Sequence, residues 1–280
     1  MHGLGNDYVV VDNRKEEIRE HELQRIAQTL CERHFSIGAD GMLLIYDSEI
    51  ADVKMRIFNA DGSEAEMCGN GIRCFAKYCY ENDITKKNEI SIETLAGTKK
   101  VWLNIVDANV QSVRVDMGPP VYEKQFIPML GDGTCINEDL QVGDRTFRVT
   151  CLSVGNPHCV TFVDNVKNFP VEAIGSQIEN HKIFPKRTNV EFVQVLNRRE
   201  LIVRVWERGV GETLACGTGA CASAAAAHLL GKTDARIVVH LPGGDLEIEI
   251  PKSILMTGPA QKIFHGMLFE ERERNENRLL

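Results

Sequence analysis

Short apolar runs separated by polar turns fill the first part of the chain, and this pattern predicts β-strands. The runs are rich in β-branched and long aliphatic residues and end near Gly, Asp or Asn. They are residues 7–12 (DYVVVD), 41–46 (GMLLIY), 53–58 (VKMRIF), 89–97, 100–106 and 110–118. Between the first two runs, apolar residues recur every three or four positions, which predicts an amphipathic helix over residues 20–33.

The second part of the chain repeats this alternation. Its predicted strands are residues 146–153, 159–164, 190–196, 201–207, 236–241 and 246–250. Two prolines at 119–120 and a turn-rich loop over residues 129–139 place a boundary between the two parts within residues 117–142. The polar end of the chain, residues 273–280, is expected to fray.

One short motif occurs twice and indicates an internal repeat. Cys-Gly-x-Gly occupies residues 68–71 and again residues 216–219, an offset of 148 positions. GND at 5–7 and GNPH at 155–158 each precede a strand that ends in aspartate, at an offset of 150. Two repeated motifs, in the same order and at nearly the same offset, predict two domains of one fold that face each other across a cleft.

A helix is predicted to follow each of these cysteines. After Cys68, apolar residues fall on one helical face, whereas residues 217–230 are apolar almost all round, with Gly231 as the expected terminator. A helix that is apolar on every side is buried. We therefore predict an α+β fold in which each half is a β-barrel-like sheet around a central helix, with the cysteine at the helix N-terminus.

That placement has chemical consequences for Cys68 and Cys216. A helix N-terminus offers unpaired N–H groups and about half a positive charge, which binds anions and is expected to lower a thiol pKa. Two facing helix N-termini would hold one anionic group, such as an α-carboxylate, with a thiol on either side of the adjacent carbon. This arrangement predicts proton removal on one face and proton delivery on the other. The sequence contains no phosphate cradle and no Schiff-base lysine motif, so we expect neither a cofactor nor a metal.

Other residues near the repeat have two open interpretations. Glu64 and Glu212 each lie four residues before the cysteine and are either catalytic groups or turn and capping residues. His158 is either structural or part of the site. Cys74 and Cys221 fall inside the predicted helices and are expected to belong to the core.

Composition narrows the class of protein. The 280 residues suggest about two domains, and 43% hydrophobic residues suffice for their cores. A net charge of −8 disfavours binding to nucleic acid or to anionic membranes, and we expect a cytoplasmic protein with neither partner. The nine cysteines form no CxxC pair, so we expect neither a disulfide framework nor a zinc module.

Five motifs, in order along nearly the whole chain, resemble those of the diaminopimelate epimerases, a family of pyridoxal-independent amino-acid epimerases of lysine and peptidoglycan precursor synthesis. The motifs are HGLGND (2–7), FNADGSEAEMCGNGIRC (58–74), GNPHCV (155–160), RTNVEFV (187–193) and WERGVGETLACGTGAC (206–221). The resemblance implies epimerisation of LL- to meso-diaminopimelate by two thiols. It also implies a first domain of residues 1–117, joined by a returning segment at about 262–272, and a second domain of residues 118–261.

The resemblance further implies a role for each matching residue. Cys68 and Cys216 would be the acid/base pair, with His158 and Glu207 tuning the thiols. The donors to the reacting carboxylate would be Gly69, Asn70, Gly217 and Thr218. The distal end of the substrate would contact Asn6, Asn59, Asn156, Asn189, Arg208 and, through an ammonium, Glu207. The expected partners are an amino-acid substrate and a second copy of the chain in a homodimer, although the sequence leaves the oligomeric state open.

Two other functions compete with this one. A related cofactor-independent racemase of proline or hydroxyproline would use the same two cysteines, but it would not need Arg208 to hold a second carboxylate. A thiol redox protein would instead join the two cysteines in a reversible disulfide.

Overall fold

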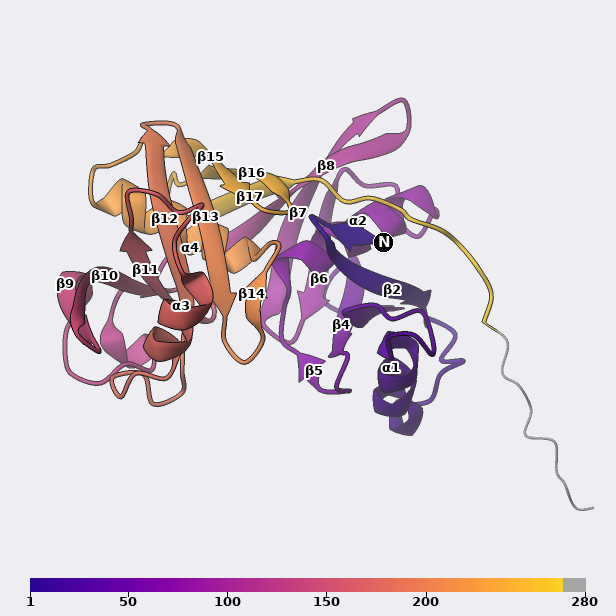
Figure 1. Cartoon of the computed structure of the whole chain (residues 1–280). Helices are drawn as coiled ribbons and strands as arrows, with labels where there is room; N and C mark the ends of the chain where they lie inside the picture. Colours follow the sequence, from indigo (N-terminus) through magenta and orange to yellow (C-terminus); the bar gives the residue numbers. More distant parts are fainter. Residues whose placement is uncertain (269–280) are drawn as a thin grey trace, which may run out of the picture.

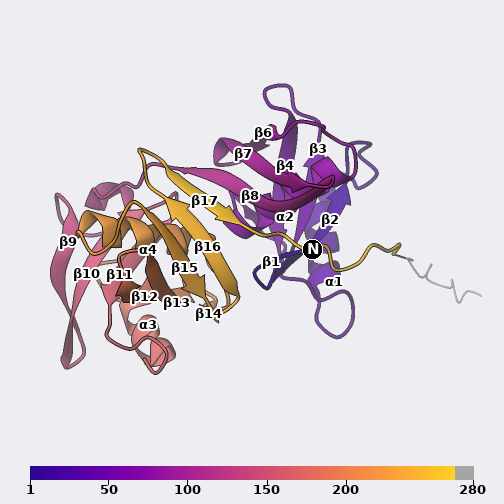
Figure 2. The same ribbon diagram turned by 90° about the horizontal axis from the view of Figure 1, so that it is seen from above.

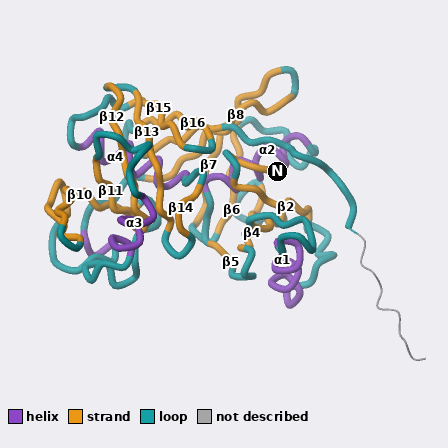
Figure 3. The backbone as a smooth tube through the Cα atoms, in the orientation of Figure 1, coloured by secondary structure: helices purple, strands orange, loops and turns teal. Residues whose placement is uncertain are grey.

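Strands make up most of the chain in the computed structural model, which describes residues 1–268 (Figure 3). Two short helices and one 3-10 turn accompany the strands of the first half. The elements of this half are β1 (His2–Gly3), β2 (Asn6–Asp12), η1 (Glu20–Glu22), α1 (Leu23–Cys31), β3 (Gly41–Tyr46), β4 (Val53–Asn59), β5 (Glu64–Ala65), α2 (Gly69–Glu81), β6 (Glu89–Thr94), β7 (Gly97–Val106) and β8 (Asn109–Gly118).

The second half follows the same order after one additional hairpin strand. Its elements are η2 (Lys124–Phe126), β9 (Cys135–Val142), β10 (Arg145–Ser153), β11 (Pro157–Phe162), α3 (Val171–Glu179), β12 (Asn189–Asn197), β13 (Glu200–Glu207), β14 (Gly211–Thr213), α4 (Gly217–Leu229), β15 (Arg236–Leu241), β16 (Gly244–Glu249) and β17 (Ile254–Gly258). Figure 1 shows the first half, coloured from indigo to the magenta of β8, beside the second half, coloured from pink through orange to yellow.

Strand pairing confirms the internal repeat. In the first half, β2 pairs in parallel with β3 and β4 pairs in parallel with β6. In the second half, β11 and β12, and then β13 and β15, pair in the same parallel sense. The register places Tyr8 opposite Gly41 and His158 opposite Asn189, so Tyr8 and His158 occupy equivalent positions.

Each half wraps its strands around one helix, as predicted. Helix α2 contacts β1, β2, β3, β4, β7 and β8, and helix α4 contacts β10, β11, β12, β13, β15, β16 and β17. The face of α2 that carries Ile72, Phe75 and Cys79 is fully buried. Almost the whole of α4 is buried, because its alanines allow the surrounding strands to approach closely. The mixed α+β fold is confirmed.

A strand connection joins the two halves. Strand β17 pairs antiparallel with β8, so the sheet continues from one half into the other (Figures 1 and 2). Beyond β17, Gln261 forms a bridge with His2. Strand β8 lies in the predicted first domain and β17 in the predicted second, and the division at residue 118 stays a prediction. Residues 273–280 and the end of the predicted returning segment lie outside the described residues.

The prediction of a loop over residues 129–139, at the boundary between the two halves, is partly wrong. Residues 135–142 form strand β9 where a loop over 129–139 was predicted. Within the described residues β9 pairs with β10 alone, so it is an edge strand whose side chains are mostly exposed and polar. Polar edge strands lack the apolar alternation by which strands are recognised. Helix α3 was not predicted either. No helix within residues 1–268 is long and apolar enough to cross a membrane.

Candidate active site

The two cysteine-bearing helices meet at their N-termini. A Cβ atom built on Gly217 would lie 3.5 Å from the Cα of Gly69, and one built on Gly69 would lie 3.7 Å from the Cα of Gly217. Met256 of β17 fills the space beside both glycines, with its methyl carbon 3.0 Å from the Cβ position of Gly69. The first residues of α2 and α4 therefore touch across the halves, and side chains larger than glycine would push them apart.

Cys68 is the N-cap residue of α2. Its backbone is extended (φ −137°, ψ 125°), and its Sγ accepts a hydrogen bond from the Gly71 N–H at 3.5 Å. The hydroxyl of Tyr8 lies 2.9 Å from the same Sγ and 2.7 Å from Oδ1 of Asn6. The Cys68 side chain is half-buried. The first thiol is therefore held by a helix N-terminus and by a phenol.

Cys216 caps α4 in the same way, with its Sγ 3.4 Å from the Gly219 nitrogen and 3.5 Å from Oγ1 of Thr218. This thiol is buried, and its neighbour Glu207 lies beside it. Burial raises the pKa of Cys216 well above its ordinary value, the charge of Glu207 raises it further, and the bonds from Thr218 and Gly219 oppose the rise. The first turn of the helix thus lowers this pKa, as expected, but the loss of hydration outweighs its donors and the net shift is upward.

His158 binds a carboxylate and an amide. Its Nδ1 lies 2.7 Å from Oε1 of Glu191, and its Nε2 lies 2.8 Å from Oδ1 of Asn156. The Asn156 amide in turn donates to Oγ1 of Thr218 at 3.3 Å. Burial raises the pKa of Glu191, and the neighbouring imidazole opposes that rise. His158 thus fixes Asn156 and, through it, the first turn of α4.

Asn70 and Arg73 connect the two halves directly behind the cysteines. The Asn70 amide donates to the carbonyl of Ala215 at 3.0 Å and to Oδ1 of Asn6 at 3.3 Å. The guanidinium of Arg73, fully buried, donates to Oδ1 of Asn70 at 3.0 Å, to the Gly69 carbonyl at 2.9 Å and to the Pro259 carbonyl at 3.1 Å. Burial lowers the pKa of Arg73, which nevertheless stays a cation at neutral pH.

The remaining candidate residues lie at the rim or support it. Asn189 is buried, with its amide donating to the Pro157 carbonyl at 2.9 Å and its Oδ1 accepting from the Arg208 backbone N–H at 2.9 Å. The Arg208 side chain is exposed. Asn59 is exposed and donates to Oγ of Ser63 at 3.0 Å. The contacts of Asn59, Asn189 and Arg208 with substrate stay predictions. What the structure shows is that Asn189 positions the backbone of Arg208.

The two glutamates upstream of the cysteines form matching ion pairs. Glu64 accepts two hydrogen bonds from Arg56, at 2.6 and 2.9 Å, and Glu212 accepts two from Arg204, at 2.6 and 2.8 Å. Each pair spans a strand and the hairpin strand that precedes the cysteine. These contacts favour the structural interpretation of both glutamates, in which they fix the approach to the helix.

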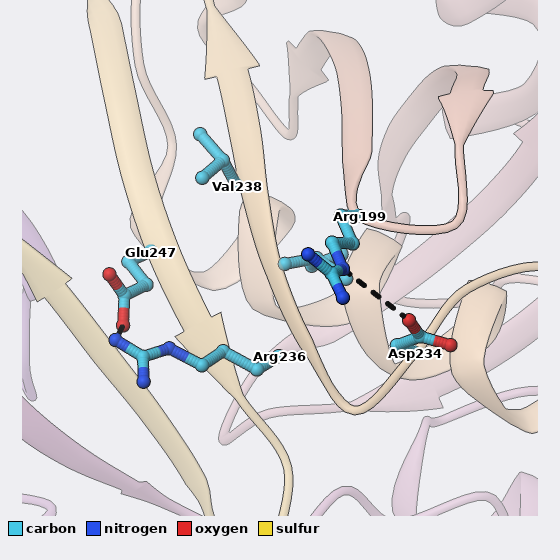
Figure 4. Close-up of a pocket in the computed structure, with 6 residues that line it drawn as sticks. Arg199, Asp234, Arg236, Val238 and Glu247 are labelled. Carbon is cyan, nitrogen blue, oxygen red and sulfur yellow. Dashed lines mark ion pairs between the residues drawn. The ribbon is translucent and has the colours of Figure 1, made fainter.

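A separate surface hollow lies over β15 and β16. Its charged side chains are paired with one another, Arg236 with Glu247 at 2.6 Å and Arg199 with Asp234 at 3.9 Å (Figure 4). It contains none of the predicted site residues. Exposed ion pairs of this kind are solvated surface and supply no reactive group.

Comparison with known proteins decides which family this site belongs to. A family model described as diaminopimelate epimerase matches residues 1–123 and 150–263. The chain belongs to the diaminopimelate epimerase family. Relatives named diaminopimelate epimerase include one from Moorella thermoacetica, 52% identical over 95% of this chain and 96% of its own, and one from Methanococcus maripaludis, 48% identical over 95% and 97%.

Solved structures show how widely this fold occurs outside the diaminopimelate epimerase family. A hydroxyproline epimerase from Agrobacterium vitis matches with a TM-score of 0.67 at 15% identity, covering 92% of this chain and 86% of its own. A phenazine biosynthesis protein of the PhzF family from Bacillus anthracis matches with a TM-score of 0.64 at 18% identity, covering 92% of both chains. At these identities the matches show the shared fold alone.

Three residues of this epimerase-family site were missed in the sequence. Tyr8 occupies the position equivalent to His158 in the repeat, so aligning the GND and GNPH motifs one residue further would have found it. Glu191 lies inside an apolar strand, where a single buried carboxylate gives no signal until its histidine partner is seen. Arg73 lies inside a helix, and its long-range acceptors become visible only in the fold.

Proposed function

We propose that this protein interconverts LL-2,6-diaminopimelate and meso-diaminopimelate without a cofactor, using Cys68 and Cys216 as the two acid/base groups. One observation carries the proposal: two helices, each capped by a cysteine, touch at Gly69 and Gly217. Membership of the diaminopimelate epimerase family supports the choice of substrate.

In this mechanism the α-carbon of the substrate sits between the two sulfur atoms. One cysteine, as the thiolate, takes the proton from its face of that carbon, which leaves a planar carbanion. The other cysteine, as the thiol, gives its proton to the opposite face and becomes the thiolate. The net change is inversion at one carbon, and the two cysteines exchange protonation states, which exchange with water restores.

The carbanion intermediate needs stabilisation because an α-C–H bond of an amino acid is far less acidic than a thiol. The N–H groups at the starts of α2 and α4 would bind the carboxylate as charge develops on it. Each such preorganised donor contributes about 2.7–4 kcal/mol to a transition state of this kind. The buried cation of Arg73, which donates to the Gly69 carbonyl, adds positive potential behind the same turn.

The remaining assignments rest on membership of the family. Asn6, Asn59, Asn156, Asn189 and Arg208 would bind the distal end of the substrate, where Arg208 would hold the carboxylate, and Glu207 would lie near the ammonium. Glu207 also lies beside the Cys216 thiol, and burial raises the pKa of this carboxyl. A homodimer and a cytoplasmic location stay predictions.

Solvent deuterium tests the proposal. The protein is incubated in deuterated water under reducing conditions with unlabelled LL-diaminopimelate and no added cofactor. Because the donating thiol has exchanged with solvent beforehand, the first meso product should carry deuterium at the inverted carbon while the remaining substrate stays unlabelled. Early product that carries mostly protium would contradict the two-thiol mechanism, because a single base returns the original proton.

The alternative functions are tested in the same assay. Proline and hydroxyproline are offered in place of diaminopimelate, and turnover of either one alone would assign the protein to the related racemases. A protein that exchanges disulfides with small thiols but turns over none of these amino acids would be a redox protein.

A further inference from the structure

The hydroxyl of Tyr8 contacts the first thiol, whereas the side chain at the equivalent position of the second half, His158, is bonded to other groups. Tyr8 and His158 are equivalent in the repeat, yet the Tyr8 oxygen lies 2.9 Å from the Cys68 sulfur, whereas His158 binds Asn156 and Glu191. The phenol is buried between Gly41 and Gly71, each of whose Cβ positions would lie within 3.5 Å of its ring. Its position is therefore fixed by packing.

We propose that Tyr8 is a positioning residue that sets the protonation state of Cys68 by donating a hydrogen bond to its thiolate. This inference rests on the proposed function of Cys68 as an acid/base group. It assigns to this phenol one of the differences between the two thiols, in addition to the deeper burial of Cys216 and its neighbour Glu207.

The hydroxyl has two acceptors within reach and one proton. When Cys68 is a thiolate, the Tyr8 O–H donates to Sγ, because a hydrogen bond to a charged acceptor is stronger than one to a neutral amide. When Cys68 is a thiol, the hydroxyl turns to donate to Oδ1 of Asn6, 2.7 Å away, and its oxygen accepts the S–H. Rotation about one C–O bond thus follows each proton transfer at the sulfur, and no heavy atom has to move.

The phenol itself does not ionise in this exchange. Burial raises the pKa of Tyr8 well above its ordinary value, and the negative charge of Cys68 raises it further. The other titratable groups that face this cluster are Arg73 and Cys74 of α2 and Asp40 ahead of β3. Tyr8→Phe leaves all three unchanged in sequence.

The test is the Tyr8→Phe variant, which removes one oxygen and keeps the ring. Iodoacetamide alkylation of each cysteine is followed by peptide mass spectrometry across pH 5 to pH 10, without substrate. We expect the pH midpoint for Cys68 to rise by about one unit and its alkylation rate at pH 7 to fall roughly tenfold, as expected for loss of a hydrogen bond to an anion. The midpoint for Cys216 should not change, and the acidic limb of the kcat/KM profile should move with that of Cys68.

Tyr46→Phe is the matched control, because its hydroxyl also takes part in a partly buried hydrogen bond, with Asn13, at the opposite end of β3 from Gly41. Incorporation of 3-fluorotyrosine at position 8 provides a variant of opposite sign. The fluorinated phenol is the stronger donor and should lower the midpoint for Cys68. This second variant decides the question if Tyr8→Phe fails to fold.

Unchanged alkylation of Cys68 in both Tyr8 variants would overturn the inference, and it would leave the epimerase proposal intact if the wild-type protein still labels its product with deuterium. Conversely, a shifted midpoint in a protein that does not turn over diaminopimelate would support Tyr8 and reject the proposed function. A shift shared by Cys68 and Cys216 would mean a general change of structure, and it would also overturn the inference.

Discussion

The two halves of the molecule share one backbone plan and differ in what surrounds the thiol. Cys68 and Cys216 have the same N-cap geometry and the same glycine-rich first turn. Cys68 is half-buried beside a phenol, whereas Cys216 is buried beside the half-buried Glu207 and near a carboxylate–imidazole pair. The comparison teaches that the repeat provides the shared feature, a helix N-terminus for an anion, while single side chains make the two thiols chemically different.

The largest expected effect comes from removing either thiol. Cys68→Ala and Cys216→Ala should each lower the rate of epimerisation by about 10²- to 10⁴-fold or more, which is the contribution of a positioned acid/base group. Each variant leaves one face of the carbon without its thiol. Turnover is measured alongside circular dichroism to confirm folding. Cys221→Ala is the control, since burial raises its pKa to about 12 and keeps it a thiol. Near-normal activity in either single active-site variant would contradict the pairing.

The next effect concerns a side chain present in one half only. Arg208 is equivalent to Ala60 in the repeat, so the second half alone offers a guanidinium at the rim. Arg208→Lys replaces a planar two-pronged donor by a point charge and should lower kcat/KM for diaminopimelate by roughly tenfold or more. Arg236→Lys, in the surface hollow, is the matched control. If both variants kept the wild-type kcat/KM, Arg208 would not contact the substrate.

A smaller effect is expected on the pH dependence of Cys216 alkylation. The raised pKa of Cys216 means that its thiolate becomes abundant only at alkaline pH, so its alkylation rate should keep rising with pH above neutrality. Glu207→Gln removes a negative charge and should move that rise to lower pH by roughly one unit. Iodoacetamide labelling of Cys216 provides the measurement, with Glu64→Gln as the control in the other half. A rise at the same pH in Glu207→Gln would show that this carboxylate does not act on the thiol.

The smallest expected effect is on stability, and it comes from making a position of α2 identical to its equivalent in α4. Cys74 of α2 is fully buried and is equivalent to Ala222 of α4, so the repeat already tolerates alanine at this position. Cys74→Ala should keep activity and lower the free energy of unfolding by about 1 kcal/mol, as expected for loss of one buried atom. Urea denaturation measures the change. A loss of activity without a loss of stability would place Cys74 in the site.

Most of the strands could be predicted from short apolar runs between polar turns, and the central helices from the apolar face after Cys68 and the apolar run after Cys216. Strand β3 begins and ends at the predicted residues, and both central helices begin beside their cysteines. Strand β9 could not be predicted, since an edge strand exposes its polar residues on both faces. The cysteines could be predicted from the repeat, but the depth at which Cys216 is buried depends on the packing of strands far apart in sequence.

The buried guanidinium of Arg73 has a consequence for the order in which the chain is completed. Its acceptor at Pro259 lies 186 residues further along, so the turn that holds Cys68 belongs to the half synthesised first but is finished by a segment synthesised late. A nascent chain that ends before β17 lacks both Met256 beside the two glycines and the carbonyl that Arg73 requires. The turn that holds Cys68 therefore gains its full set of contacts only after the last strand of the second half has been synthesised.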